Sequence, residues 1–350
     1  MFLSTQNNHS ALIPIAWPNM VARAPEFYLK ILRKLRIMKN INVLVGHAAL
    51  VVVTEDQFIY TDFGRYITPK GFGRARSAKT DPKLAIDLKP QWSENGQLLN
   101  FEELFREMEQ NAHATHGENE LYASIMYDVD VHNALQYISE IQDKGFIPYS
   151  GMKKNESNCA RFVTNTILRS ITSSNKVFSR LSKPITISPT PFFNVIASNE
   201  DGKYYVFHQG KLSAHQEDYK ISRKEILKKL SYSFRSSKSK LLPTDAQEGQ
   251  TLAPIKPECM NSDAVYLGGI GEGAWYNTVD SSNDFIKVIR NYRDGKMEFE
   301  QIYNFEREWH EKLNEGMVEI VHDSHFAWVT LSDKQTGKKK RFYAKQNDGE

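Results

Sequence analysis

The sequence predicts an α+β protein in which a mixed region of strands and helices precedes an all-β region. Residues 43–208 alternate strand-like and helix-like segments, and residues 232–262 are rich in Ser, Pro and Gly. About seven short strands then follow at close spacing. We therefore expect one domain over residues 1–231, a linker over residues 232–262 and a small antiparallel β-barrel or sandwich over residues 263–350.

Composition and charge exclude several classes of protein. The 350 residues are 40% hydrophobic and 25% charged, and the net charge of +3 is too small to indicate a nucleic-acid partner. Two cysteines give no disulfide framework. The longest apolar run, Ala48 to Val53, is too short to span a bilayer, and residues 1–9 lack the basic start and apolar core of a signal peptide. We expect a cytoplasmic protein with no cofactor, and the sequence predicts no oligomeric state.

The N-terminal region predicts an extended segment followed by a helix. Two prolines keep residues 11–24 extended. Residues 25–37 then have the pattern of a basic amphipathic helix, with apolar side chains at Phe27, Ile31, Leu32 and Leu35. Its basic residues are Lys30, Arg33, Lys34 and Arg36. They could face a membrane surface, but we favour the solvated face of a docked helix.

The central region predicts a hairpin and then alternating elements. Val43 to Val53 is an apolar strand, a turn follows at residues 55–57, and Phe58 to Tyr66 is the partner strand. Residues 69–77 form a loop rich in Gly and Arg. We expect helices at 101–111 and 131–144, strands at 121–127, 184–197 and 203–208, and an extended segment at 146–149. In the C-terminal region we expect strands at 264–268, 273–279, 284–292, 297–305, 317–323, 325–332 and 340–345.

Cys159 stands at a predicted helix start. Polar, turn-forming residues, Asn155-Glu156-Ser157-Asn158, lead into the apolar stretch that follows Cys159. Ser157 or Asn158 can cap this helix, which places Cys159 in its first turn. The backbone N–H groups and the helix dipole at that position stabilise a thiolate. The alternative is a small buried hydrophobe under the helix.

His47 is the candidate base for this nucleophile. It begins the apolar strand in Gly46-His47-Ala48-Ala49-Leu50, where the small neighbours leave room for a substrate or a facing helix. Alternation places His47 on the same face as Ala49 and Val51. With a short turn at residues 55–56, Asp62 lies one diagonal away and can accept a hydrogen bond from the ring; a three-residue turn would shift the register. A satisfied core histidine is the alternative.

The order of histidine on a strand, acid on the next strand and cysteine at a helix start resembles the circularly permuted papain-like superfamily. This superfamily includes the NlpC-related, YiiX-like and lecithin:retinol acyltransferase-like groups. The residues that carry the resemblance are Gly46-His47-Ala48-Ala49-Leu50 and Asn158-Cys159-Ala160-Arg161-Phe162-Val163, within about residues 40–210. It implies an antiparallel sheet packed on helices, with Cys159 as nucleophile, His47 as base and Asp62 as the orienting residue. The chain is more similar to uncharacterised bacterial members with a C-terminal small β-barrel.

The chemistry predicted for such a site is acyl transfer through a thioester. We expect a cysteine amidase or peptidase, for which a cell-wall-like peptide is one candidate substrate. An acyltransferase or lipid hydrolase on the same Cys–His pair is an alternative, and so is a binding protein that keeps the fold without activity. Tyr149 precedes the nucleophile helix and could donate to the oxyanion, although a tyrosine after Pro148 could equally be a packed aromatic.

Three arginines follow the hairpin. Arg65, Arg74 and Arg76 could bind a phosphate or carboxylate of a small-molecule, peptide or lipid substrate. The alternative is a solvated loop with local ion pairs, for instance to Asp81. We expect no metal site, because the closely spaced histidine pairs lack nearby cysteines or paired carboxylates. These pairs are His113 with His116 and His322 with His325.

Overall fold

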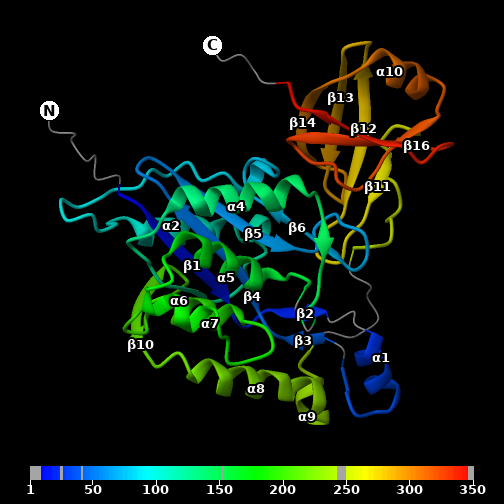
Figure 1. The fold of residues 1–350 in the computed structure, drawn as a ribbon. Coiled ribbons are helices and arrows are strands. Elements are labelled where there is room, and N and C mark those ends of the chain that lie inside the picture. The colour runs from blue at the N-terminus through cyan, green and yellow to red at the C-terminus, as the bar shows by residue number, and fades with distance from the viewer. Residues whose placement is uncertain are drawn as a thin grey trace, which may run out of the picture. The chain divides into compact units, whose positions relative to one another are not determined.

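The structure is a computed structural model that describes residues 9–23, 27–40, 42–151, 153, 155–242 and 250–345 (Figure 1). Three expectations fall partly outside the described residues. They concern the signal peptide (residues 1–8), the start of the first helix (Pro25) and part of the linker (residues 243–249). The chain divides into two compact units. The first comprises residues 1–63, 84–144 and 148–246, and the second comprises residues 64–83, 145–147 and 247–350. No helix among the described residues is long and apolar enough to cross a membrane.

An antiparallel sheet forms the centre of the first unit. Six of its strands follow the order β10-β9-β7-β1-β4-β5. Their bounds are β1 (Ala11–Trp17), β4 (His47–Val53), β5 (Phe58–Gly64), β7 (Leu121–Ala123), β9 (Lys203–His208) and β10 (Lys211–Gln216). Every residue of β1 and of β4 is buried, as expected for strands covered on both faces. A separate ribbon pairs β2 (Val21–Arg23) with β3 (Asn42–Leu44).

Helices cover both faces of this sheet. On one face, α2 (Phe101–Gln110) contributes Leu104 and Phe105 to a core shared with Ala49 and Val51, and α3 (Ala112–Thr115) follows it. On the other face, α7 (Pro191–Ala197) packs Val195 against Ala16. The helices α4 (Val131–Asp143) and α5 (Cys159–Ser170) pack on β4 (Figure 1). The remaining helices of the unit are α1 (Phe27–Lys34), α6 (Lys176–Leu181), α8 (Ile221–Phe234) and α9 (Ser236–Ser239).

Several local expectations are wrong. The strand predicted at residues 43–53 is divided into β3 and β4, which pair in different sheets. Residues 191–197 form helix α7 where the sequence predicts a strand, because the Thr190 hydroxyl caps the Phe193 N–H and Pro191 fits the first helical position. Residues 72–76 form strand β6 (Phe72–Arg76) inside the predicted loop. Helix α8 continues through residues 232–234 and α9 covers residues 236–239, both within the range that the sequence assigns to the linker. In each of the other segments the local composition favoured the wrong type of secondary structure. The aromatic residues of 191–197 favoured a strand, the glycines of 69–77 a loop and the serines after residue 231 a linker.

The second unit carries two antiparallel sheets. The first consists of β11 (Val265–Leu267), β12 (Ala274–Ser281), β13 (Phe285–Asn291) and β14 (Met297–Asn304), and the second of β15 (Val318–Ile320), β16 (Trp328–Asp333) and β17 (Lys339–Tyr343). All seven lie at the predicted positions, and α10 (Arg307–Asn314), which the sequence did not predict, lies between the sheets in the chain. A bridge joins Tyr303 to Ala344, but the described strands do not close into a barrel. The α+β class, with an antiparallel sheet packed on helices, is confirmed. Short elements complete the chain: a 3-10 helix (Pro82–Leu84) and β8 (Ile147–Pro148).

Candidate active site

The register of the β4–β5 hairpin brings Asp62 to His47. Ala49 pairs directly with Asp62, and Val51 pairs with Tyr60. His47 is therefore one diagonal away from Asp62, as the short turn predicts, and the three-residue alternative is excluded. The ring Nε2 of His47 lies 3.2 Å from the Oδ2 atom of Asp62. Because Asp62 is fully buried and His47 is 9% exposed, this contact is shielded from water.

Gly46 sets the position of His47 at the start of the strand. The backbone of Gly46 has φ +82°, a conformation that side chains rarely tolerate. A Cβ atom there would lie 2.7 Å from the carbonyl oxygen of Trp17 and 2.8 Å from the Cα atom of Pro18. The Trp17 ring in turn stacks on the His47 imidazole, with the ring centroids 5.8 Å apart. The close approach of these two segments of the chain therefore holds the imidazole against the flat apolar face of the Trp17 ring.

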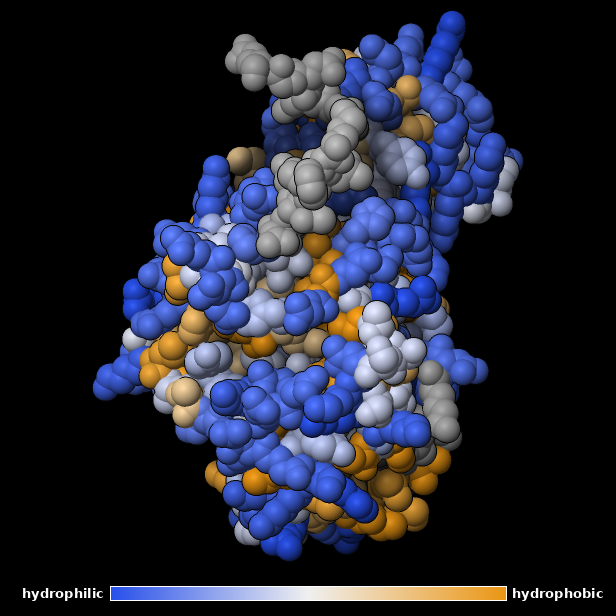
Figure 2. Space-filling view, turned by 60° about the vertical axis from the view of Figure 1, so that its left-hand side comes forward, coloured by the Kyte–Doolittle hydropathy of each residue, from blue (hydrophilic) through white to orange (hydrophobic). Residues whose placement is uncertain are grey.

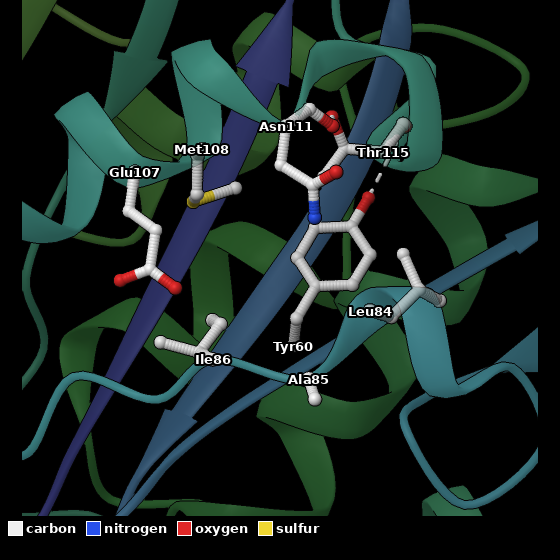
Figure 3. Close-up of a pocket in the computed structure, with 8 residues that line it drawn as sticks. All are labelled: Tyr60, Leu84, Ala85, Ile86, Glu107, Met108, Asn111 and Thr115. Atoms are coloured by element: carbon white, nitrogen blue, oxygen red, sulfur yellow. Dashed lines mark hydrogen bonds between the residues drawn. The ribbon is translucent and has the colours of Figure 1, made fainter.

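Tyr60 supports the carboxylate from behind. Its hydroxyl lies 3.1 Å from Asp62 Oδ2 and 3.3 Å from the Thr115 carbonyl oxygen, and either oxygen can accept its proton. The ring also lines a small pocket under α2 and α3 (Figure 3). Its other lining residues are Leu84, Ala85, Ile86, Glu107, Met108, Asn111 and Thr115. Neither His47 nor Cys159 lines this pocket, so it is separate from the candidate catalytic residues.

Cys159 is the first residue of α5, as the sequence predicts. Asn158 is the cap: its side-chain oxygen accepts the Arg161 N–H at 3.0 Å, and its amide nitrogen donates to the Ser150 carbonyl, also at 3.0 Å. The thiol is 8% exposed and shares a hydrogen bond with the His47 side chain. Backbone hydrogen bonds from Ala48 and Ala160 also reach the sulfur. Strand β4 and helix α5 thus meet at the thiol.

The segment before α5 is fastened by Arg161. Its Nη1 atom donates to the carbonyl oxygens of Ser150 (3.3 Å), Lys153 and Glu156 (2.6 Å). The helix start is therefore held by a cap and by a guanidinium that gathers the preceding carbonyls. Such bonds fix the direction from which the first turn of α5 presents Cys159.

The electrostatics of the pair favour an imidazolium and a thiolate. Burial by itself lowers the pKa of His47, but the hydrogen bonds and negative charges of Asp62 and Cys159 outweigh it and raise that pKa to about 9. Burial likewise raises the pKa of the Cys159 thiol, yet the hydrogen bond and charge of His47 lead to a net lowering. A lowered thiol pKa beside a protonated imidazole is how cysteine nucleophiles are activated.

Tyr149 lies next to this segment as a packed aromatic. Its backbone bridges Ser157, and its ring stacks on Phe63 with centroids 5.9 Å apart. Phe63 stacks in the same way on Phe162 of α5. The ring therefore belongs to an aromatic cluster beside the nucleophile helix, which corresponds to the second of the two interpretations left open by the sequence. A role as oxyanion donor stays a prediction.

The three arginines belong to the second unit. Arg74 is buried and forms a two-pronged pair with Asp81, both N–O distances being 2.7 Å. Arg76 is fully buried, lies 3.3 Å from a Glu272 oxygen and stacks over a tyrosine ring. The Arg65 carbonyl oxygen accepts the Gly271 N–H. Arg74 and Arg76 thus form the ion pairs of the alternative that the sequence left open, but from a buried strand and not from a solvated loop. Substrate binding by any of the three arginines stays a prediction.

Sequence reasoning missed three residues that build the site. Trp17 and Tyr60 contact the histidine and its carboxylate, and Arg161 gathers the carbonyls before α5. Tyr60 carried a signal, because alternation already placed it on the face of Asp62. Trp17 carried none, since its contact depends on the pairing of β1 with β4, which no local pattern in the sequence specifies.

Comparisons with known proteins give two family matches. Residues 12–176, which include His47, Asp62 and Cys159, match a family described as type VI secretion system effector TseH-like. Residues 264–345 match the DUF6695 C-terminal domain. The solved structure of the type VI secretion system effector TseH is 16% identical, with a TM-score of 0.42 over 61% of this chain and 100% of that chain. No curated protein matches.

Proposed function

We propose that the first unit is a cysteine hydrolase that uses Cys159 as nucleophile, His47 as base and acid, and Asp62 as the residue that orients His47. The observation that carries the proposal is the continuous chain from the Asp62 carboxylate through the His47 ring to a thiol of lowered pKa. A cysteine at a helix start, its base and a third polar group are the parts that acyl transfer requires.

In the first half of the reaction, the Cys159 thiolate attacks the carbonyl carbon of an amide or ester. The imidazolium of His47 then gives its proton to the departing amine or alcohol as the bond to carbon breaks, which leaves a thioester on Cys159. Asp62 stabilises the imidazolium and holds the ring through Nε2, which leaves the other ring nitrogen for the exchange of a proton with Cys159.

In the second half, neutral His47 removes a proton from water, which attacks the thioester and releases the acid. Each step passes through an oxyanion, for which the N–H groups at the start of α5, including that of Cys159, are the candidate donors. A preorganised donor of this kind contributes about 3 kcal/mol to transition-state stabilisation. The Arg161 N–H is already bonded to the Asn158 side chain, so it is not such a donor.

The family match supports an effector role for the same residues, because the matched range contains all three members of the chain from Asp62 to Cys159. A secreted effector would act outside the cytoplasm of the cell that makes it, so the cytoplasmic location inferred from the sequence stays a prediction. The resemblance to the circularly permuted papain-like superfamily, with its peptide amidases, is the basis for proposing a peptide amide as substrate.

Acylation by an activated ester tests the proposal without knowledge of the substrate. We expect p-nitrophenyl acetate to give a burst of one p-nitrophenolate per protein and an acetyl group on Cys159, detected by mass spectrometry of the digested chain. Cys159→Ala should abolish the burst, and Cys259→Ser, which removes an exposed thiol, should leave it intact. Acetylation of Cys259 alone would contradict the proposal.

The fate of the acyl group separates the two enzyme classes. If water is the natural acceptor, the acetyl group leaves Cys159 at a rate that added amines and alcohols hardly change. An acyltransferase would instead transfer it to the added acceptor, which mass spectrometry of the acceptor detects. A protein that only binds would show no burst at all.

A further inference from the structure

Two segments of the first unit hold most of the excess positive charge of the chain. Residues 31–40 and 220–242 contain twelve Lys or Arg and one acidic residue. The whole chain has 45 basic and 42 acidic residues, so the remainder carries 33 and 41. The protein is therefore acidic apart from these two segments, and its small net charge conceals a strong local asymmetry.

The two segments are joined in the fold. The backbone N–H groups of Lys39 and Asn40 donate to the Ser233 carbonyl oxygen near the end of α8. The Asn40 side chain also donates to the carbonyl oxygen of Ser239, in α9. Residues 31–40, which include the end of α1, are thus attached to the end of α8 and to α9 (Figure 1). We call residues 31–40 and 220–242 together the basic surface.

Large apolar side chains are exposed on the basic surface. Leu35 is 63% exposed, Leu227 59% and Leu241 73%, and Ile37 and Phe234 are exposed as well. Figure 2 shows hydrophobic residues beside hydrophilic ones at the lower end of the molecule, where α8 and α9 lie in Figure 1. Exposed apolar groups that gather in this way mark a surface for a partner rather than for water alone.

The two segments themselves contain a single carboxylate. Glu225 is the only acidic residue in the two segments, and it pairs at 2.6 Å with Lys229, which is buried. Lys34, Arg36 and Lys228 are exposed. The surface therefore presents cations and aliphatic side chains together, the combination that anionic lipids attract through their headgroups and their acyl boundary.

We propose that the basic surface binds an anionic phospholipid membrane, with the ends of α1 and α8 and helix α9 lying on it. Four of the five exposed apolar side chains named above are aliphatic, which favours a bilayer over a single-stranded nucleic acid, whose bases stack on aromatic side chains. The helices lie on the membrane and do not cross it, because no described helix is long and apolar enough. This binding is independent of the chemistry at Cys159.

Vesicle co-sedimentation of the full chain tests the proposal. We expect binding to phosphatidylcholine vesicles that contain phosphatidylglycerol and at least about tenfold weaker binding to phosphatidylcholine alone, since each cation near an anionic surface contributes about 1 kcal/mol. Binding should weaken at high salt, which screens charges. Equal binding to both kinds of vesicle, or binding to neither, would overturn the proposal.

Matched charge variants locate the binding. Lys34→Glu with Lys228→Glu should weaken binding about tenfold or more. Lys203→Glu with Lys211→Glu changes the same charge at exposed lysines of β9 and β10 and should change binding by less than about twofold. If both double variants lose binding equally, the attraction is to total charge and the basic surface is not the site.

A matched apolar pair tests insertion into the lipid. Leu35→Ser should weaken vesicle binding severalfold, whereas Ile187→Ser, at a position 61% exposed outside the basic surface, should not. Sedimentation velocity and a nucleic-acid shift assay identify other occupants. A dimer that Leu35→Ser dissociates, or binding to nucleic acid without binding to vesicles, would contradict the proposal. Cys159→Ala should bind vesicles as the wild type does, so this result does not depend on the hydrolase proposal.

Discussion

His47 Nε2 lies 3.2 Å from the Asp62 carboxylate, across one diagonal of the β4–β5 ladder. This contact fixes one ring nitrogen of His47 and leaves the other for the hydrogen bond with Cys159. It also raises the pKa of His47, because a buried carboxylate stabilises the imidazolium. The ladder register therefore sets both the direction and the charge of the candidate base.

Asp62→Asn should lower the pKa of His47 from about 9 toward the ordinary value of 6.5, as NMR titration of the ring would measure. The pKa of His47 is higher in the folded than in the unfolded protein. The stability that the Asp62–His47 pair contributes is therefore fully present below pH 6.5 and is lost as the pH rises through about 9. We expect Asp62→Asn to lower the free energy of unfolding by about 1.5–3 kcal/mol below pH 6.5 and by much less above pH 9. Asp56→Asn, at the exposed hairpin tip, should cost little at either pH. An equal cost of Asp62→Asn at both would contradict this account.

His47→Ala should raise the pH midpoint for alkylation of Cys159. In the wild type, the imidazolium overcomes burial and the pKa of the thiol is lowered. Without the imidazolium, burial raises it, so less thiolate is present at neutral pH and alkylation slows about tenfold. Iodoacetamide rates measured across pH give the midpoint. The rate at Cys259 in the same chain serves as the control and should not change.

Gly46→Ala should destabilise the protein more than Gly210→Ala does. Both glycines have positive φ, but a Cβ atom at Gly46 would meet the backbone of Trp17 and Pro18, whereas at Gly210 it would meet nothing within 4 Å. The strain common to both costs about 1 kcal/mol, and the contact adds to it at Gly46 alone. Urea unfolding measures the difference. Gly46→Ala should also slow Cys159 alkylation by displacing His47, and equal effects of both variants would contradict the role given to Gly46.

Asp81→Asn should destabilise the second unit strongly. Asp81 pairs with both Arg74 and Arg290, and all three residues are buried. Burial by itself raises the pKa of Asp81, but the two arginines outweigh it and hold that pKa well below 3.8. Breaking a buried pair costs about 3–5 kcal/mol, whereas Asp294→Asn removes an exposed pair and should cost about 0–1 kcal/mol. The stability that Asp81 contributes is present above 3.8 and is lost as the pH falls through its lowered folded pKa. Equal costs would mean that Arg74 and Asp81 are not a structural pair.

The sequence predicted the site best where local rules decide the geometry. Alternation and turn length placed Asp62 opposite β4, and the capping pattern at Asn158 placed Cys159 at the start of α5. Contacts between segments that are distant in the sequence could not be predicted in this way. The stacking of Trp17 on His47 depends on strand pairing across the sheet.

Local composition misled in other places. The segment at residues 191–197 is rich in apolar and β-branched residues, yet the cap at Thr190 makes it a helix. The arginines of the predicted loop were candidates for ligand binding or for local ion pairs, for instance to Asp81, and the sequence did not place them in a strand. In the folded chain, Arg74 pairs with Asp81 from within the buried strand β6. From the sequence alone, an arginine near glycines that binds a substrate carboxylate cannot be told from one that pairs with a carboxylate of the same chain.

The central claim is that Cys159 is an activated nucleophile, and competition between the two cysteines tests it most directly. Iodoacetamide at neutral pH, with both sites quantified by mass spectrometry in the same molecule, gives the ratio of their rates. We predict that Cys159 reacts about tenfold faster than Cys259, although Cys159 is buried and Cys259 exposed, and that His47→Ala removes the advantage. If Cys159 reacts no faster than Cys259 and His47→Ala leaves its rate unchanged, Cys159 is not the nucleophile.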